Sequence, residues 1–414
     1  MNLQDLKNRT ILLLGKSRAF SEDEFLLQLQ FHHITLTKEP NVDVEFVVEG
    51  RMMSPYEQNL SDTLYEEEKY AFMAIDLFEK LLAQEIDNDT LLMSLKLSND
   101  KKRLKSFLQN SCIEDALFFK LLKMYSFGGE DFFENDDNRD VSAALIARFY
   151  ENIERNHNVQ YATTGIYHLI TQTKNEQLLE AIAFLEPSKK HPKILKALAL
   201  HEKTPRNVLK MFLKKGDEAT KEAMAYNVNL DKSIARELIK NKKFAEIAAQ
   251  NIRLDEEMFL LLSVCKHALA ANETLNEVMQ QELVTCNDEM IHLALAANEC
   301  LHVTTCKHLL CLNNEKIRQV IYANSATPRD ILESAYKEGN YNEPLSRNNA
   351  TPQNILEELF KCGDAQILLN LAKNENTPVE ILYQLQLESR FERAVKTNKA
   401  FAKHIQNENI GWLV

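Results

Sequence analysis

The stretch Ala-Lys-Asn-Glu-Asn-Thr-Pro-Val-Glu-Ile-Leu, residues 372–382, recurs in outline along the chain beyond about residue 195. Another copy is Asn-Asn-Ala-Thr-Pro-Gln-Asn-Ile-Leu, residues 348–356. Each copy has an anchor residue, then Thr-Pro or a substitute from three positions later, then an apolar pair. The anchors follow one another at intervals of 21 to 26 residues, at His201, Asn227, Asn251, Asn272, Asn298, Asn324, Asn348, Asn374 and Asn398. Regular self-similarity at this period is typical of a repeat architecture.

Other positions keep a fixed distance from the anchor and predict the outline of one repeat. Thr followed by Pro predicts a helix N-cap with Pro at the first helical position, where its missing N–H costs nothing. A left-handed helix end is predicted fifteen positions after the anchor, at Gly216, Asn287, Asn313, Gly339 and Gly363. The start of a second helix is predicted at Asp217, Asp288 and Asp364. We therefore expect two-helix repeats that stack, since one unit cannot bury its apolar face alone. The alternative is a chance similarity within an ordinary helical bundle.

The two quoted stretches resemble the leucine-rich repeat variant family, and the resemblance covers about residues 195–405. It implies a right-handed α-solenoid of alternating α and short 3-10 helices. The copies from Asn251 to Asn298 lack Thr-Pro, so we expect different turns there. Some family members carry an iron–sulfur cluster on clustered cysteines ahead of the repeats. This chain has only Cys112 in that region, so the resemblance implies no cluster.

Residues 1–90 predict a small α/β module. Short β-favouring runs alternate with helical stretches, which predicts strands at 9–14, 34–37, 42–48 and 70–74 and helices at 21–29, 55–66 and 76–84. The order β-α-β-β-α-β-α resembles the BRCT domain, a protein–protein interaction module. Gly15 and Phe78 stand where such domains favour a glycine and a large aromatic residue. The usual Trp is absent and the second helix offers no Lys for a phosphate pocket, so phosphopeptide binding is not implied.

The remaining segments complete a mainly α chain in which the small α/β (BRCT-like) domain precedes the solenoid. Apolar periodicity predicts a helical connector at 91–127, and Gly128-Gly129 with the acidic residues after them predicts a linker at 128–140. Degenerate helical capping repeats are expected at 141–194, with a C-terminal tail at 406–414. Trp412 lies in that tail, where it either folds back to seal the last repeat or acts as a docking segment for a partner.

Charge and apolar content limit the possible partners. The 414 residues carry a formal net charge of −12, and residues 1–150 hold 17 Lys and Arg against 27 Asp and Glu. Direct nucleic-acid binding is therefore disfavoured, because it depends on a basic field. The longest early apolar run, residues 11–14, is too short for a signal peptide, and no run approaches a membrane span. We expect a cytoplasmic monomer with no membrane contact and with its seven cysteines reduced.

Three features of the sequence suggest chemistry, and none of them is complete. Gly15-Lys16-Ser17 suggests a phosphate loop, but Thr10 stands where the motif needs its first glycine. The residues Cys286, His292, Cys300, His302, Cys306, His308 and Cys311 suggest a metal or redox site, but they lack a C-x2-C spacing. A DNA-glycosylase reading lacks aromatic walls for a flipped base. We therefore assign no catalytic, cofactor-binding or metal-binding residues and expect no cofactor.

The sequence thus favours a protein–protein interaction scaffold that is not an enzyme and that binds a peptide or protein on the solenoid surface. The alternative is an accessory factor of a DNA-processing or repair complex, recruited through the BRCT-like module. A basic stripe on the repeat surface would favour the alternative, whereas bound zinc or iron in the purified protein would indicate a third class, a metal or redox sensor.

Overall fold

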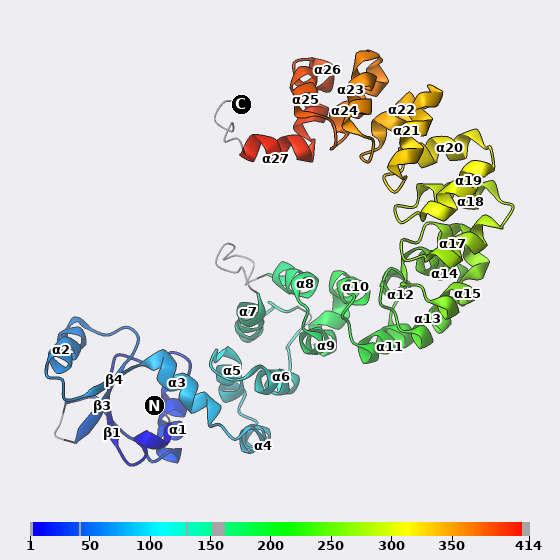
Figure 1. Cartoon of the computed structure of the whole chain (residues 1–414). Helices are drawn as coiled ribbons and strands as arrows, with labels where there is room; N and C mark the ends of the chain where they lie inside the picture. Colours follow the sequence, from blue (N-terminus) through cyan, green and yellow to red (C-terminus); the bar gives the residue numbers. More distant parts are fainter. Residues whose placement is uncertain (1–2, 41–42, 130, 151–161, 408–414) are drawn as a thin grey trace. The chain divides into compact units, whose positions relative to one another are not determined.

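The computed structural model describes residues 3–40, 43–129, 131–150 and 162–407. The chain is mainly helical and carries one small parallel four-stranded sheet near its N-terminus (Figure 1), which confirms the predicted fold class at that level. It divides into two compact units, Met1–Met211 and Phe212–Val414. The division falls inside helix α11, Arg206–Lys215, whereas the sequence placed the start of the repeats at about residue 195.

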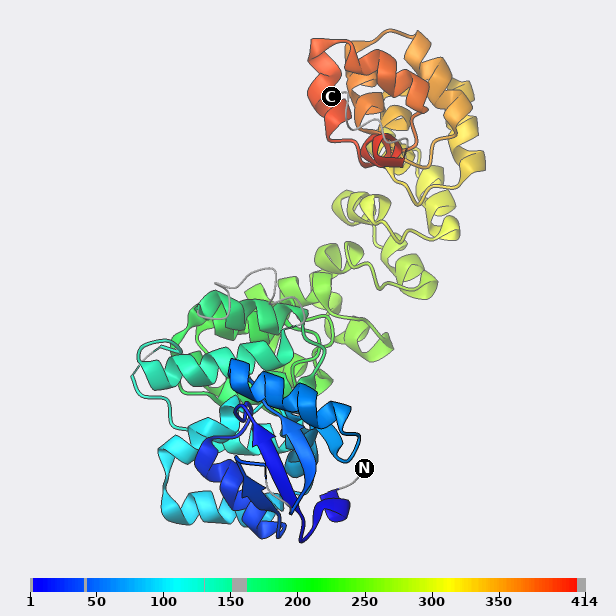
Figure 2. The ribbon, with the colours of Figure 1, turned by 90° about the vertical axis from the view of Figure 1, so that its left-hand side faces the viewer.

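The sheet of the first unit, drawn in blue in Figure 2, is built from the N-terminal part of the chain. Its strand order is β2-β1-β3-β4, and every neighbouring pair is parallel. The predicted order β-α-β-β-α-β-α is confirmed, and the ends of the elements move by at most a few residues. The elements are β1 Thr10–Leu14, α1 Glu22–Phe31, β2 Thr35–Thr37, β3 Val44–Glu49, α2 Pro55–Glu66, β4 Ala71–Ala74 and α3 Ile75–Gln84, after a 3-10 turn, η1, at Leu3–Leu6.

Both faces of this sheet are covered, which explains the continuous apolar run of β1. Leu12 and Leu14 pack with Leu64 of α2 on one face. Phe25 of α1 meets Phe78 of α3 edge to face, with ring centroids 5.9 Å apart, and both rings are buried. Gly15 ends β1 at φ 84°, and a Cβ there would lie 2.6 Å from the Arg51 carbonyl oxygen. Only glycine fits that turn without strain.

Helices fill the rest of the first unit. They are α4 Asn88–Ser98, α5 Lys101–Gln109, α6 Asp115–Met124, α7 Asp136–Phe149, α8 Thr163–Gln172, α9 Glu176–Phe184, the 3-10 turn η4 Pro187–Lys190 and α10 Pro192–Leu200. The segment predicted as an acidic linker, 128–140, is held to this unit by buried groups. Phe132 is fully buried, and the amide of fully buried Asn138 donates to the carbonyls of Gly128 and Asp131.

The second unit consists of short helices that alternate along the chain. They are α12 Glu218–Ala225, α13 Lys232–Leu238, α14 Lys242–Asn251, α15 Glu256–Leu261, η5 Ser263–Cys265, α16 Lys266–Ala270, α17 Glu277–Val284, α18 Glu289–Ala297, α19 Val303–Cys311, α20 Glu315–Ala323, α21 Arg329–Glu338, α22 Asn342–Arg347, α23 Gln353–Lys361, α24 Ala365–Lys373, α25 Val379–Gln386, α26 Ser389–Lys396 and α27 Lys399–Asn407.

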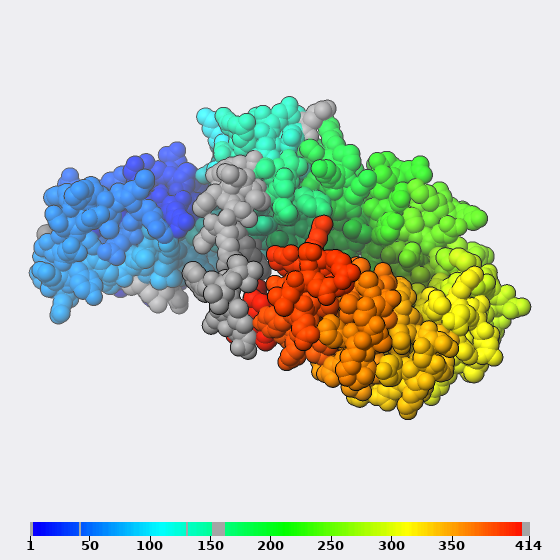
Figure 3. Space-filling model, turned by 90° about the horizontal axis from the view of Figure 1, so that it is seen from above, coloured from blue at the N-terminus to red at the C-terminus, as the bar shows by residue number. Residues whose placement is uncertain are grey.

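Consecutive repeats of this unit are in direct contact. Each even-numbered helix from α12 to α24 packs against the next even-numbered one, so the second helices of the repeats form a row. The space-filling view shows the side chains of successive repeats, yellow through orange to red, in continuous contact (Figure 3). The expectation of a helical repeat architecture is therefore confirmed for these residues.

Two details of the predicted repeat are wrong. The helices α21, α23 and α25 begin one residue after the proline, and their N-caps are Pro328, Pro352 and Pro378, with no side-chain cap. The threonine before each proline instead donates its hydroxyl to the preceding helix. Thr351 and Thr377 bond the carbonyls of Leu345 and Leu371 at 2.7 and 2.8 Å. The hydroxyl therefore satisfies a carbonyl at a helix end, where no N–H of the helix is available.

The predicted helix ends are confirmed only in part. Gly339, Gly363 and Asn313 are left-handed, with φ of 79°, 70° and 52°, whereas Gly216 and Asn287 are not among the described residues with positive φ. The aspartates were predicted correctly, because Asp217, Asp288 and Asp364 each accept a backbone N–H as N-caps of α12, α18 and α24.

Candidate functional site

The anchor asparagines form a hydrogen-bonded ladder through the second unit. The side-chain Nδ2 of Asn348 donates to the carbonyl oxygens of Tyr322 and Asn324, at 2.9 and 2.7 Å. Asn324 is the preceding anchor, and Tyr322 lies two residues before it in the chain. The same pair of bonds, at 2.7–3.1 Å, recurs at Asn298, Asn324, Asn374 and Asn398, whereas Asn272 donates to the carbonyls of Ala249 and Ile252 at 2.8 Å. Each rung therefore joins one repeat to the repeat before it.

The remaining oxygen of each anchor side chain stabilises its own turn. Oδ1 of Asn348 accepts the N–H of Ala350 at 2.7 Å, and Oδ1 of Asn374 accepts the N–H of Asn376 at 2.8 Å. An asparagine amide has two N–H donors and one carbonyl, so all three polar groups are used. The anchors at 348 and 374 are 1% and 2% exposed. The ladder is thus a structural feature, and the anchor side chains have no polar group left for other contacts.

One predicted anchor, Asn251, is wrong. Helix α14 continues through Asn251, whose Nδ2 donates to Ile247 within the same helix. The residue at the helix end is Ile252, and its carbonyl accepts the next rung from Asn272 at 2.8 Å. Because a carbonyl belongs to every residue type, the acceptor side of the ladder does not require asparagine at this position.

Gln280 is a second polar group that the sequence analysis missed. It stands in α17 eight positions after its anchor, where Leu332, Leu356 and Leu382 stand in repeats that carry Thr-Pro. Gln280 is fully buried, its Nε2 donates to the Cys300 carbonyl at 2.8 Å, and its Oε1 accepts the His302 N–H at 2.9 Å. This side chain holds the turn of the next repeat, which lacks Thr-Pro.

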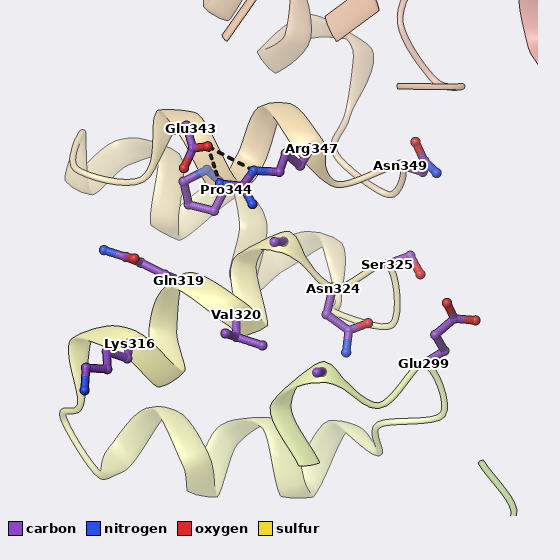
Figure 4. A pocket seen from close by; sticks show the side chains of 12 residues that line it. Glu299, Lys316, Gln319, Val320, Asn324, Ser325, Glu343, Pro344, Arg347 and Asn349 are labelled. Carbon is purple, nitrogen blue, oxygen red and sulfur yellow. Dashed lines mark hydrogen bonds and ion pairs between the residues drawn. The ribbon is translucent and has the colours of Figure 1, made fainter. Parts of the chain in front are cut away.

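A hollow of about 600 Å³ opens over the row of second helices at α20 (Figure 4). Its lining includes small apolar side chains, those of Ala297, Val320 and Ala323. Polar side chains surround it: Lys316 pairs with Glu289 at 3.3 Å, and Arg347 pairs with Glu343 on α22. We call this cavity the α20 hollow. Its lining carries both signs of charge, so it is not a basic stripe.

A row of exposed side chains borders the α20 hollow. Glu299, Ser325 and Asn349 each follow an anchor directly, are exposed, and lie one above another in Figure 4. A similar hollow of about 580 Å³ lies between α14 and α16, with His267 and Ala271 in its lining. We call the surface that carries both hollows the second-helix face, defined by Ile247, His267, Ala271, Ala297, Gln319 and Arg347. On this face, equivalent positions of successive repeats carry different side chains, as Glu299, Ser325 and Asn349 do.

The cysteines and histidines between 286 and 311 are not brought together. Among the described residues no group of three or more His, Cys, Asp or Glu side chains is placed to hold a metal. His292 bonds the Val284 carbonyl at 3.0 Å, and His308 bonds the Gln281 side chain at 2.6 Å. Cys306 is fully buried, and burial raises the pKa of its thiol to about 11. At neutral pH this thiol therefore stays protonated. Because the thiolate is the form that reacts and binds metals, Cys306 is an unreactive group of the core.

The Gly15-Lys16-Ser17 turn also receives a structural explanation. The Gly15 N–H donates to the carboxylate of Glu57 at 2.9 Å, and the same carboxylate accepts the Ser54 N–H at 2.6 Å. These backbone bonds, Ser54 first, hold the pKa of Glu57 below its usual value. A side-chain carboxylate therefore satisfies the Gly15 amide. Trp412 lies outside the described residues.

Comparison with known protein families, curated proteins and solved structures found no match to this chain. None of the helices in the described part of the chain is both long enough and apolar enough to span a membrane.

Proposed function

We propose that this protein is a non-catalytic interaction scaffold, which binds a peptide or protein along the second-helix face. The observation that carries the proposal is the division of labour between two sets of side chains. All polar groups of the buried anchor side chains bond the backbone. The side chains around the α20 hollow are exposed instead, and they recur at the same position of successive repeats. A rigid frame with variable exposed positions suits recognition of an extended ligand.

We further propose that the repeats form a right-handed α-solenoid of the leucine-rich repeat variant type. The ladder supports this reading, because each rung joins neighbouring repeats only, which is how a solenoid is held together. A cytoplasmic location and a monomeric state belong to the same proposal.

A second candidate function is an accessory role in a DNA-processing complex through the N-terminal module. The all-parallel sheet and the glycine turn at Gly15 favour kinship with the BRCT domain. The lining of the α20 hollow argues against direct DNA contact there, since Lys316 and Arg347 are paired with acids.

The test uses two matched charge-reversal variants of the full chain. Lys316→Glu with Arg347→Glu changes the α20 hollow, whereas Lys307→Glu with Lys337→Glu changes exposed positions on the first helices of the same region. Partners captured from native cells by the unmodified protein should be lost with the first variant and kept with the second. Equal retention, or equal loss with unchanged folding, would refute binding at the second-helix face.

A further inference from the structure

A third cavity, unrelated to the repeats of the second unit, opens between α4, α5 and α6. It has a volume of about 800 Å³, in the range of pockets that bind ligands. Leu92, Leu95, Leu104 and Met124 give it an apolar lining, and Met93, 58% exposed, extends the apolar surface beside it. Methionines are flexible and polarisable, so such a lining adapts to different apolar side chains.

Four lysines also line this cavity: Lys96, Lys101, Lys120 and Lys123. Ion pairs hold many other cations of this unit; Lys105, for example, contacts Asp137 and Asp140 at 2.6 and 2.9 Å. None of the four lysines has a carboxylate within ion-pair distance in the described part of the chain. We call this cavity the lysine-rimmed pocket.

Acidic groups beside the pocket do not neutralise the rim. Asp89 and Asp100 also line it, and Asp100 is engaged as the N-cap of α5, where it accepts the Arg103 N–H at 3.0 Å. The lining therefore has four positive and two negative side chains. This excess stands out, because the first 150 residues as a whole hold 17 basic against 27 acidic residues.

A stabilising effect on their own helices explains the positions of only some of the four lysines. Lys96 and Lys123 lie in the last turns of α4 and α6, where a cation interacts favourably with the helix dipole. Lys101 is the first residue of α5, whose first turn has no acidic residue. A cation at that end opposes the dipole. The placement of Lys101 is thus not explained by the helix dipole, and it adds to the positive charge around the pocket.

We propose that the lysine-rimmed pocket binds an acidic amphipathic peptide segment of a partner protein. Apolar side chains on one face of that segment would enter the lining of Leu92, Leu95, Leu104 and Met124. Flanking Asp and Glu side chains would pair with the four lysines. Helix-in-groove recognition of this kind uses apolar anchors at helical spacing, with charge complementarity setting orientation.

The surrounding charge selects a peptide over an anionic membrane. A bilayer would approach a wide area of the first unit, whose net charge is acidic, and would be repelled within a Debye length of the surface. A single peptide segment contacts the lysines and the apolar lining alone. This site is independent of the second-helix face, which belongs to the other unit.

The test measures binding of labelled peptides of about 16 residues to the full chain by fluorescence anisotropy. The first peptide has Leu at i, i+3, i+4 and i+7 with Glu between them. The second has Lys in place of Glu, and the third has Ser in place of Leu. We expect binding of the first peptide only, and about tenfold weaker binding to Lys120→Glu with Lys123→Glu. Lys80→Glu, an exposed lysine of α3, is the control and should change binding by less than about twofold.

Several outcomes would overturn the proposal. These are failure of the first peptide to bind, equal binding of the Lys-containing or Ser-containing peptide, and an affinity that Lys120→Glu with Lys123→Glu leaves unchanged. Tighter binding to phosphatidylserine vesicles than to the first peptide, lost in the same variant, would assign the pocket to a membrane surface instead. Circular dichroism confirms folding, which exposed lysines should not disturb.

Discussion

The asparagine ladder shows how one side chain can define a repeat. Asn348 donates two hydrogen bonds to the preceding repeat and accepts one from its own turn, and it does so while almost fully buried. Buried carbonyls need partners, and the turns between helices provide no regular backbone donor for them. Asparagine recurs because its amide supplies two donors and one acceptor at one position.

Replacing Asn348 with Ala should lower the free energy of unfolding of the second unit by about 3 kcal/mol, since three hydrogen bonds are lost and buried groups lose their partners. Urea unfolding of the full chain measures this effect. Asn354→Ala, at an exposed position of α23, is the matched control and should stay within about 0.5 kcal/mol. Similar losses in both variants would contradict the ladder.

Gln280→Leu tests whether the buried glutamine is structural. Comparison with the other repeats would suggest that leucine is stabilising at this position. We expect the opposite, a loss of about 1–3 kcal/mol, because the His302 N–H and the Cys300 carbonyl would be left without their partner. A higher unfolding midpoint in urea for this variant would show that the bonds contribute nothing.

Glu57 should make the N-terminal module sensitive to acid. Its pKa is lower in the folded protein than its ordinary value, since the Ser54 and Gly15 N–H groups stabilise the carboxylate. A depressed pKa stabilises the fold above the unfolded value and loses that effect as pH falls through the folded value. Glu57→Gln should therefore be less stable than the unmodified protein at pH 7, with the difference shrinking below about pH 4. Thermal unfolding across this range checks the trend; a constant difference would exclude ionisation as the cause.

At the scale of elements, the sequence predicted correctly those helices and strands that depend on residues close to them in the chain. Helix α2, Pro55–Glu66, was predicted at its observed ends, and the structure shows a local signal for its start, a capping box of Ser54 and Glu57. The threonines of Thr-Pro were misassigned, since their hydroxyls bond a helix that precedes them and not the one they begin. The roles of Gln280 and Ile252 depend on contacts with other repeats, which no local pattern encodes.

The candidate site was less accessible to sequence reasoning than the fold. The regular spacing of the repeats located the anchors. It could not show that their side-chain amides bond the backbone of the preceding repeat, or that a hollow opens at α20. The lysines of the lysine-rimmed pocket come from three helices, and only packing brings them together.

The left-handed turn that ends α23 gives a prediction at the element scale. Gly363 has φ of 70°, and a Cβ built there meets nothing within 4 Å. Gly363→Ala should therefore cost about 1–2 kcal/mol from backbone strain alone. Gly363→Asn should cost less, because Asn313 adopts the same conformation in another repeat. Unfolding free energies in urea compare the two, and an equal or larger loss for asparagine would contradict this explanation.

For the whole molecule, the division into two compact units predicts that local damage stays within one unit. In Asn348→Ala, hydrogen exchange should accelerate in the helices of the neighbouring repeats, α20 to α24. The amides of β1 and β3 should exchange as in the unmodified protein, since their hydrogen bonds lie in the first unit. Mass spectrometry on the intact chain resolves the two sets of peptides, and faster exchange in the sheet would show that the units unfold together.

The central claim is that the second-helix face is where a partner binds, and site-specific photo-crosslinking in living cells tests it most directly. A photoreactive amino acid would replace Gln319 in the α20 hollow and, as the control, Ser334 on the exposed side of α21. We predict that position 319 yields a reproducible crosslink to one protein, which Lys316→Glu with Arg347→Glu abolishes, while position 334 yields none. Crosslinks at 334 but not at 319, or none at either position, would contradict the account.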